Sequence, residues 1–140
     1  MVKGMGFMGN NYGGDDRIVM VVPADTAAAA AEKLTTPATG HNVHYVASDD
    51  RTAPEIAHVS GAAIGRPELT WAIFNDEQTQ TGLEKSGMPA QLTASLIELG
   101  AGIHSGVLRQ DYDRHKPTGV LGKVKPKDFA REFAARFQQG

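Results

Sequence analysis

An apolar, β-branched run that leads directly into a proline constrains the fold of this chain most. Residues from Ile18 to Val22 are all apolar, which is typical of a short strand buried on both faces. Pro23 suits the first turn of a helix, and Asp25 stands near the positive end of its dipole. The alanines that follow predict a helix over Pro23–Leu34, whose small side chains call for another segment packed closely against it. A buried strand that leads into a helix indicates an α/β fold.

The same alternation continues along the chain. Further strands are predicted at Val43–Ala47 and Leu69–Phe74, and Thr52 and Glu55 have the spacing of a capping box that opens a helix. The remaining helices are predicted at Asp76–Lys85, at Pro89–Val107 and from Pro126 to Phe137. We therefore expect an α/β chain, or an α+β fragment, with about three short strands and five helices. Residues 1–140 should form one domain, in which residues 1–17, rich in Gly, Asn and Asp, form an irregular loop.

Three predicted helices carry apolar faces for the core. The face of the capped helix consists of Ile56, Val59, Ala63 and Ile64. The stripe of the longest helix consists of Leu92, Leu96, Leu99, Ile103 and Val107, and the last helix carries Phe129, Phe133 and Phe137. Three glycines on the longest helix, Gly100, Gly102 and Gly106, predict close approach of another backbone or a ligand.

The stretch GMGFMG matches the G-x-G-x-x-G spacing of a dinucleotide-binding turn at Gly4, Gly6 and Gly9. That turn needs a buried strand before its first glycine and a helix that begins within the motif. Only three residues precede Gly4, and the residues after Gly9 are typical of turns and loops. We interpret the match as accidental and assign no cofactor-binding residue to it.

Two further motifs are weighed and set aside. Tyr112 and Lys116 match Y-x-x-x-K, in which the lysine lowers the pKa of a proton-donating tyrosine. Pro117 biases Lys116 away from the helical conformation that this pairing needs, so no catalytic residue is assigned. His41 and His44, in a turn and on a predicted strand, have no third ligand at a readable spacing, so no metal site is expected.

One short polar segment and two histidines lie outside these motifs. Asp49-Asp50-Arg51 is expected to form a solvated turn, and His58 is expected on an exposed helix face. His104 ends the longest helix and leaves two interpretations open: it lines a site, or it bonds a carbonyl group at the helix end.

Composition excludes several classes of protein. The net charge is −2, with acidic and basic residues interspersed, which argues against partners such as nucleic acid or an anionic membrane surface. The absence of cysteine excludes disulfides, thiolate catalysis and cysteine-based zinc sites. We expect a cytoplasmic protein, because no apolar run is long enough to span a membrane and residues 1–10 lack the order of a signal peptide.

Several stretches together resemble the NmrA-like proteins, a branch of the atypical short-chain dehydrogenase/reductase superfamily. VMVVPADTAAAAAEKL resembles their strand–Pro–Asp–helix segment, and HNVHYVASDDRTAPEIAHVSGAAIGRPELTWAIF resembles the strand, helix and strand that follow. AGIHSGVLRQDYDRHKP and GKVKPKDFAREFAARF resemble the C-terminal part of the same family. The resemblance runs from about Gly9 to Phe137 and covers only the second half of such a protein. It implies that the Rossmann half, with most contacts to NAD(P), would lie before residue 1.

The resemblance also implies where a substrate would bind. In the whole-family protein this half closes over the nicotinamide and selects the substrate. By resemblance, the cleft would be lined by the loop at Asn10, Asn11 and Tyr12 and by the segment His104–His115, within which Asp111, Tyr112 and His115 are candidates.

Two functions remain open from the sequence. The chain is a substrate-binding and dimerising half-domain without catalysis of its own, or it is part of an NAD(P)H-dependent oxidoreductase of the quinone, azo-dye or flavin reductase kind. In the second case a partner or a longer gene product supplies the Rossmann half. We expect a homodimer and no cofactor in this chain alone, because the alanine helix and the leucine stripe would otherwise leave apolar surface open to water.

Overall fold

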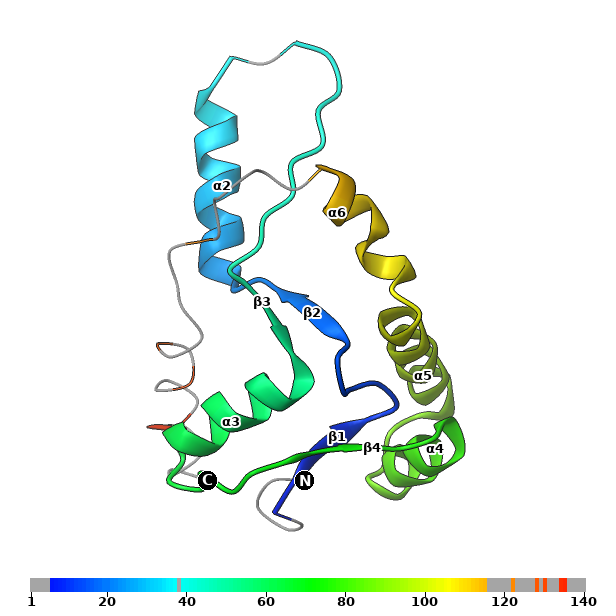
Figure 1. The fold of residues 1–140 in the computed structure, drawn as a ribbon. Helices are drawn as coiled ribbons and strands as arrows, with labels where there is room; N and C mark the ends of the chain where they lie inside the picture. Colours follow the sequence, from blue (N-terminus) through cyan, green and yellow to red (C-terminus); the bar gives the residue numbers. More distant parts are fainter. Residues whose placement is uncertain are drawn as a thin grey trace.

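The computed structural model describes residues 6–37, 39–115, 122, 128, 130, 134 and 135. Its strands are β1 (Met8–Asn10), β2 (Arg17–Met20), β3 (Asp49–Thr52) and β4 (Trp71–Ile73). Its helices are α2 (Pro23–Thr35), α3 (Ala53–Ala63), α4 (Asp76–Lys85), α5 (Ala90–His104), the 3₁₀ turn η1 (Val107–Arg109) and α6 (Gln110–His115). The α/β class expected from the sequence is confirmed (Figure 1).

The four strands form two separate pairs. β1 runs parallel to β4, with Met8 opposite Trp71 and Asn10 opposite Ile73. β2 runs antiparallel to β3, with Arg17 opposite Thr52. The parallel pair requires a long crossover, which β2, α2, β3 and α3 provide.

The positions of two strands differ from the prediction. Residues 8–10 form β1, so the region 1–17 is not an irregular loop throughout. Val43–Ala47 is not a strand; the strand that pairs with β2 lies six residues later, at Asp49–Thr52, where a solvated turn was expected. The charged side chains of β3 are accommodated because they form ion pairs along the sheet surface, as between Arg51 and Asp49 at 2.7 Å. β2 is also half-buried rather than buried on both faces.

Helix α3 begins as predicted and packs differently from the prediction. Thr52 and Glu55 form the reciprocal capping box. The buried positions are Ala53, Ala57 and Gly61, whereas the residues of the predicted face are all half-buried. A side chain at Gly61 would overlap the carbonyl of Arg66, so small residues allow the chain to pass close to α3 on its way to β4.

Helix α5 ends three residues earlier than predicted. Gly106, with a φ of 72°, adopts the left-handed conformation just after the helix, and Val107 belongs to η1. The predicted close approach is found at Gly100, but its cause is the side chain of Asn11 rather than a backbone or a ligand. The buried face of α5 runs through Thr93 and Gly100, while Leu92 and Leu99 of the predicted stripe are each 49% exposed.

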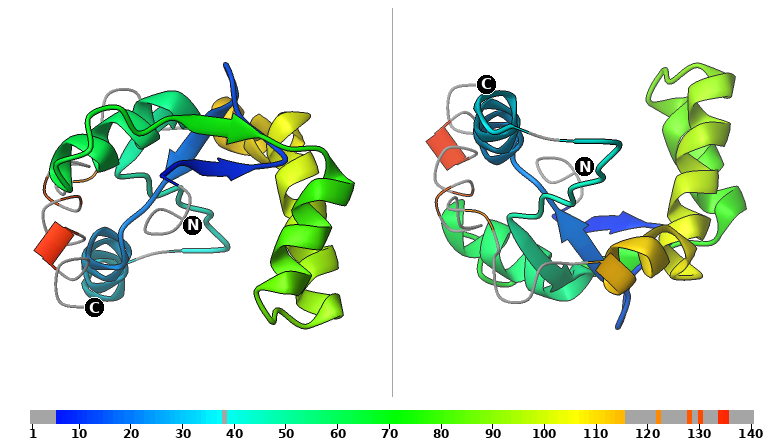
Figure 2. Two further views of the ribbon diagram at one scale, coloured as in Figure 1. Left: turned by 90° about the horizontal axis from the view of Figure 1, so that it is seen from below. Right: turned by 90° about the horizontal axis from the view of Figure 1, so that it is seen from above.

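Helix α2 stands apart from the other described elements, on the side of the molecule opposite α4 and α5 (Figures 1 and 2). Asp25 is its one buried residue, and Leu34 near its C-terminus is 88% exposed. Among the described residues, little of the expected packing against the alanines is found. Asp25 accepts a hydrogen bond from Ser48 Oγ at 2.7 Å, and Ser48 Oγ accepts one from the amide of Val22, which ties the start of α2 to β3.

The predicted aromatic ridge of Phe129, Phe133 and Phe137 lies outside the described residues. Four neighbouring positions, at 128, 130, 134 and 135, are helical, and Ala130 and Ala134 are buried. Within the described part of the chain, every helix is too short or too polar to cross a lipid bilayer.

Candidate functional site

The loop after β1 is held in place by Asn11. Its Nδ2 donates hydrogen bonds of 2.9 Å to Asp76 Oδ1, at the start of α4, and to the carbonyl of Ile97 in α5. Asn11 is 8% exposed. Its side chain therefore anchors the loop that the resemblance places in the cleft.

Asn10 and Tyr12, on either side of Asn11, are half-buried. The ring of Tyr12 packs on Trp71 at a centroid distance of 5.5 Å, and Trp71 Nε1 donates to the carbonyl of Tyr12 at 2.8 Å. Burial raises the pKa of Tyr12, although a hydrogen bond with the Asn10 side chain acts in the opposite direction. The Tyr12 hydroxyl therefore stays protonated at neutral pH.

His104 meets a partner that neither of its two interpretations foresaw. Its Nδ1 lies 2.8 Å from Asp16 Oδ2, and the same carboxylate accepts the amide of Gly13 at 2.9 Å. Burial alone would raise the pKa of Asp16, but the hydrogen bonds from Gly13 and His104 outweigh it and lower that pKa. The contact between His104 and Asp16 thus connects the C-terminal end of α5 to the loop 12–16.

The other predicted residues gather elsewhere, around Tyr45. The Tyr45 hydroxyl bonds Asp111, and its ring stacks on His115 at 6.1 Å and meets Tyr112 edge-on at 6.0 Å. His115 Nδ1 lies 3.2 Å from Asp111 Oδ1. The segment His104–His115 therefore makes two sets of contacts, one with the loop 12–16 and one with Tyr45. Tyr45 was not among the candidate site residues, because it lies in the segment predicted to be a strand. Lys116, the second residue of the Y-x-x-x-K motif, lies outside the described residues.

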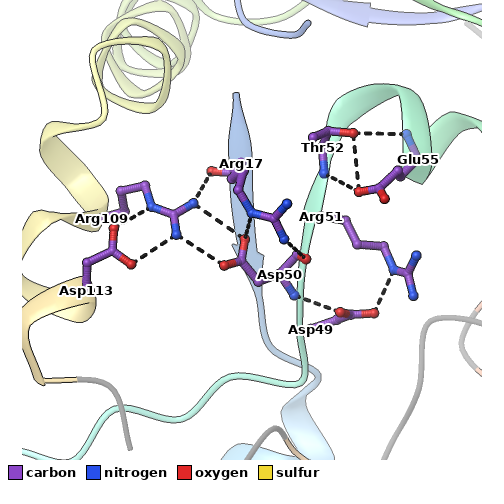
Figure 3. Close-up of polar contacts among 8 residues, drawn as sticks. All are labelled: Arg17, Asp49, Asp50, Arg51, Thr52, Glu55, Arg109 and Asp113. Carbon is purple, nitrogen blue, oxygen red and sulfur yellow. Dashed lines mark hydrogen bonds and ion pairs between the residues drawn. The ribbon is translucent and has the colours of Figure 1, made fainter. Parts of the chain in front are cut away.

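An ion-pair network joins the turn after α5 to the β2–β3 pair (Figure 3). Arg109 contacts both carboxylate oxygens of Asp113, at 2.7 and 3.0 Å, and lies 3.1 Å from Asp50 Oδ2. Arg17 reaches the same Asp50 at 3.2 Å. The hydrogen bonds that Arg109 donates to Asp113 raise the pKa of the Arg109 guanidinium further above neutrality, and burial has a smaller effect in the opposite direction. The network orients η1 and α6 relative to the strands.

A hollow of about 530 Å³ lies between β1, the segment after β4 and one face of α4. Its lining residues are Phe7, Gly9, Asn10, Phe74, Gln78, Thr79, Gly82, Leu83 and Ser86. Of the candidates named from the sequence, this set contains only Asn10. The lining residues at positions 78–79, 82–83 and 86 recur with the spacing of one helical face. This spacing was the signal in the sequence that could have indicated this wall of the hollow. A concave, mostly apolar site of this size is typical of small-molecule binding.

The described part of GMGFMG, Gly6 to Gly9, has a structural role. Gly9 lies in β1, and a side chain there would come within 2.5 Å of the Ala72 carbonyl and 2.6 Å of Phe74. Within residues 6–16 no helix begins, so this segment lacks the helix start that receives a pyrophosphate. Gly4 lies outside the described residues.

In the part of the chain that the structure describes, no group of three or more His, Asp or Glu side chains is placed to hold a metal.

No protein-family model matches the chain, and no curated protein matches it in sequence. Solved structures do match. A triphenylmethane reductase from Citrobacter sp. has a TM-score of 0.71 at 20% identity, covering 94% of this chain and 45% of that one. The same enzyme complexed with NADP(H) has a TM-score of 0.72 at 20% identity, covering 92% of this chain and 44% of that one.

The NADPH-dependent quinone oxidoreductase QOR2 of Escherichia coli, complexed with NADPH, has a TM-score of 0.70 at 21% identity. The match covers 95% of this chain and 45% of that one. The likeness is one of fold. The chain therefore has the fold of about half of an NAD(P)-dependent reductase and spans less than half the length of these neighbours.

Proposed function

We propose that this chain is the substrate-side half of an NAD(P)H-dependent oxidoreductase of the NmrA-like kind. The observation that carries the proposal is the coverage. The alignments take in 92 to 95% of this chain but only 44 to 45% of the matched reductases, of which two structures are complexes with NADP(H) or NADPH. A complementary half that binds the nucleotide would complete the enzyme.

The chain's own residues fit the binding of a substrate rather than of a dinucleotide. The hollow along α4 supplies a mostly apolar site, and Asn10 lines it. The loop that carries Asn10 is held by the hydrogen bonds of Asn11 and by the Asp16–His104 contact, so its geometry is kept without a ligand. NADPH, bound by the complementary half, would supply the hydride.

The proposal is tested by assaying the chain alone and together with the polypeptide encoded directly upstream of it. We expect the chain alone not to bind NADPH at micromolar concentration, and the combination to oxidise NADPH when a quinone or a triphenylmethane dye is added. Micromolar binding of NADPH by the chain alone would contradict the assignment of nucleotide binding to the complementary half. Failure of the combination to oxidise NADPH with either acceptor would contradict the oxidoreductase assignment.

A second candidate is a module that pairs with its own copy without catalysis. The observation in its favour is exposed apolar surface at the end of α5 and in η1, where Leu99, Val107 and Leu108 are 49 to 55% exposed. Such surface is typical of an interface between chains. In this case the combination above would show no NADPH oxidation, while the chain alone would be a dimer.

A further inference from the structure

Helix α4 buries a hydroxyl group that no neighbour among the described residues satisfies. Thr79 is 8% exposed and lines the hollow, and its Oγ1 has no hydrogen-bond partner among the described residues. A buried, unpaired hydroxyl is costly, and such groups are rare in folded proteins unless water or a ligand satisfies them. Thr79 Oγ1 therefore offers a hydrogen bond to whatever occupies the hollow.

The other polar side chains of the hollow already have local partners. Asn10 Oδ1 accepts the amide of Asn11 at 2.9 Å, and Gln78 Oε1 accepts the amide of Asn75 at 3.0 Å. Ser86 Oγ donates to the carbonyl of Leu83 at 2.6 Å. Thr79 is thus the one polar lining residue whose side chain makes no such bond within the described chain, and its hydroxyl is left to bond an occupant.

The opposite wall of the hollow is aromatic. The rings of Phe7 and Phe74 lie 5.9 Å apart at an interplanar angle of 53°, and the absence of a side chain at Gly9 lets the Phe74 ring lie over β1. Among the described residues, no charged side chain belongs to the lining. Aromatic rings favour flat aromatic partners, and an ion would lose its hydration here without gaining a counter-charge.

Gly82 extends the hollow toward solvent. It lies within α4, where glycine destabilises a helix relative to alanine. A Cβ atom at Gly82 would meet nothing within 4 Å, so packing inside the chain does not demand a glycine there. The missing side chain instead leaves open space on α4 next to Thr79, which lies about one helical turn earlier.

From these observations we propose that the hollow binds an uncharged aromatic molecule whose carbonyl oxygen accepts a hydrogen bond from Thr79. The rings lie against Phe7 and Phe74, and the molecule passes over Gly82. That this molecule is a substrate rests on the proposed function; that it binds does not.

The test uses two probes of one size, 2-acetylnaphthalene and naphthalene-2-carboxylate, titrated into the 140-residue chain by calorimetry without any nucleotide. We expect saturable binding of the ketone, and binding of the carboxylate at least about tenfold weaker because none of the described lining residues is a cation. No binding of the ketone below about 1 mM would overturn the proposal. Equal affinity for the carboxylate would overturn the assignment to an uncharged ligand.

Variants of α4 then locate the site. Thr79→Val keeps the shape and removes the hydroxyl, and should weaken ketone binding about fivefold. Thr81→Val makes the same change at an exposed position of α4 outside the lining, and should leave binding unchanged. Gly82→Leu should fill the open turn and weaken binding about tenfold or more, while helix propensity keeps α4 folded. Equal affinities of the Thr79 and Thr81 variants would overturn the role of Thr79.

This experiment separates the two proposals. Ketone binding without NADPH oxidation in the combined assay would refute the oxidoreductase assignment and leave the binding site standing. NADPH oxidation without ketone binding would do the reverse.

Discussion

The side chain of Asn11 fills the space beside α5 that the missing side chain of Gly100 leaves open. The side-chain amide of Asn11 occupies the space where a side chain at position 100 would stand, and it bonds Asp76 and the Ile97 carbonyl at 2.9 Å. Glycine in the interior of α5 lowers helix stability by about 1 kcal/mol relative to alanine. That cost is offset by the contact, because the loop after β1 can then approach α5 closely.

A double-mutant cycle tests this match. Gly100→Ala should destabilise the chain by about 1–3 kcal/mol through overlap with Asn11, and Asn11→Ala by a similar amount through two lost hydrogen bonds. Because Asn11→Ala removes the atoms that Gly100→Ala would overlap, the double variant should lose clearly less than the sum. Urea denaturation measures the four free energies of unfolding. Additive losses would contradict the contact.

Gly9 and Gly82 provide a second comparison. Gly9→Ala should destabilise the chain by about 1–3 kcal/mol, because its Cβ would overlap the Ala72 carbonyl and the Phe74 ring. Gly82→Ala should instead stabilise it by up to about 1 kcal/mol, since the new methyl group meets open space in a helix. Thermal unfolding of the two variants should therefore shift in opposite directions from the parent chain.

The Asp16 carboxylate predicts a pH dependence of stability. Its pKa is lower in the folded chain than the value near 3.9 usual for an unfolded chain. The stabilisation is therefore fully present above about pH 4 and is lost as the pH falls through the folded pKa. Asp16→Asn should flatten the fall in stability between about pH 4 and pH 2. An acid limb identical to that of the parent would show that this carboxylate does not contribute.

At the scale of elements, Arg109 connects segments that are distant along the chain. It bonds Asp113 in α6, Asp50 in β3 and the carbonyl of Arg17 in β2. Its side chain is 21% exposed, so these bonds are partly shielded from water and salt. Through this residue α6 keeps a defined position against the strands (Figure 3). The cluster around Tyr45 is positioned with it, because Asp111, Tyr112 and His115 belong to α6.

Arg109→Met should therefore loosen α6 without removing its helical residues. We expect a loss of stability of about 1.5–3 kcal/mol, since several charge-assisted bonds disappear, and faster hydrogen exchange at amides 110–115. Lys33→Met removes the cation of an exposed pair 3.5 Å from Glu32 and serves as control, with a change within about 0.5 kcal/mol. Unchanged exchange in α6 would show that Arg109 does not hold this helix.

At the scale of the whole molecule, several large apolar side chains of the described residues are exposed to solvent. Helix α2 is exposed along most of its length, and Leu92, Leu99 and Val107 are about half-exposed. Symmetric pairing is the commonest way in which proteins cover such surfaces. A complementary half of a larger protein would cover them equally well.

For the chain alone we predict a homodimer. Light scattering should give about twice the monomer mass of 14.9 kDa, and Leu99→Glu should dissociate the dimer without unfolding it. Glu98→Gln, at the neighbouring exposed position, should leave the dimer intact. A constant mass of one chain across a tenfold dilution would refute the dimer.

Signals of short range were predicted well from the sequence. The capping box at Thr52 and the proline at the start of α2 place the starts of two helices, because caps and prolines act within a few residues of themselves. The α/β alternation followed from the same local signals. Of the candidate site, the residues from Asn10 to Tyr12 and from Asp111 to His115 were named by resemblance, and their role in binding stays a prediction.

Only the tertiary structure decided which residues meet. Strand pairing is a contact between distant segments. The polar run Asp49–Thr52 forms β3 because Arg17 and Arg109 neutralise Asp50, while Val43–Ala47 forms no strand. The hollow likewise needs Phe7, Phe74 and Thr79 in one place, and no spacing along the chain reveals that. The sequence by itself determined where helices begin and which class of fold they build, since those signals act over single turns. The positions of the strands and the composition of the hollow depend on partners far along the chain.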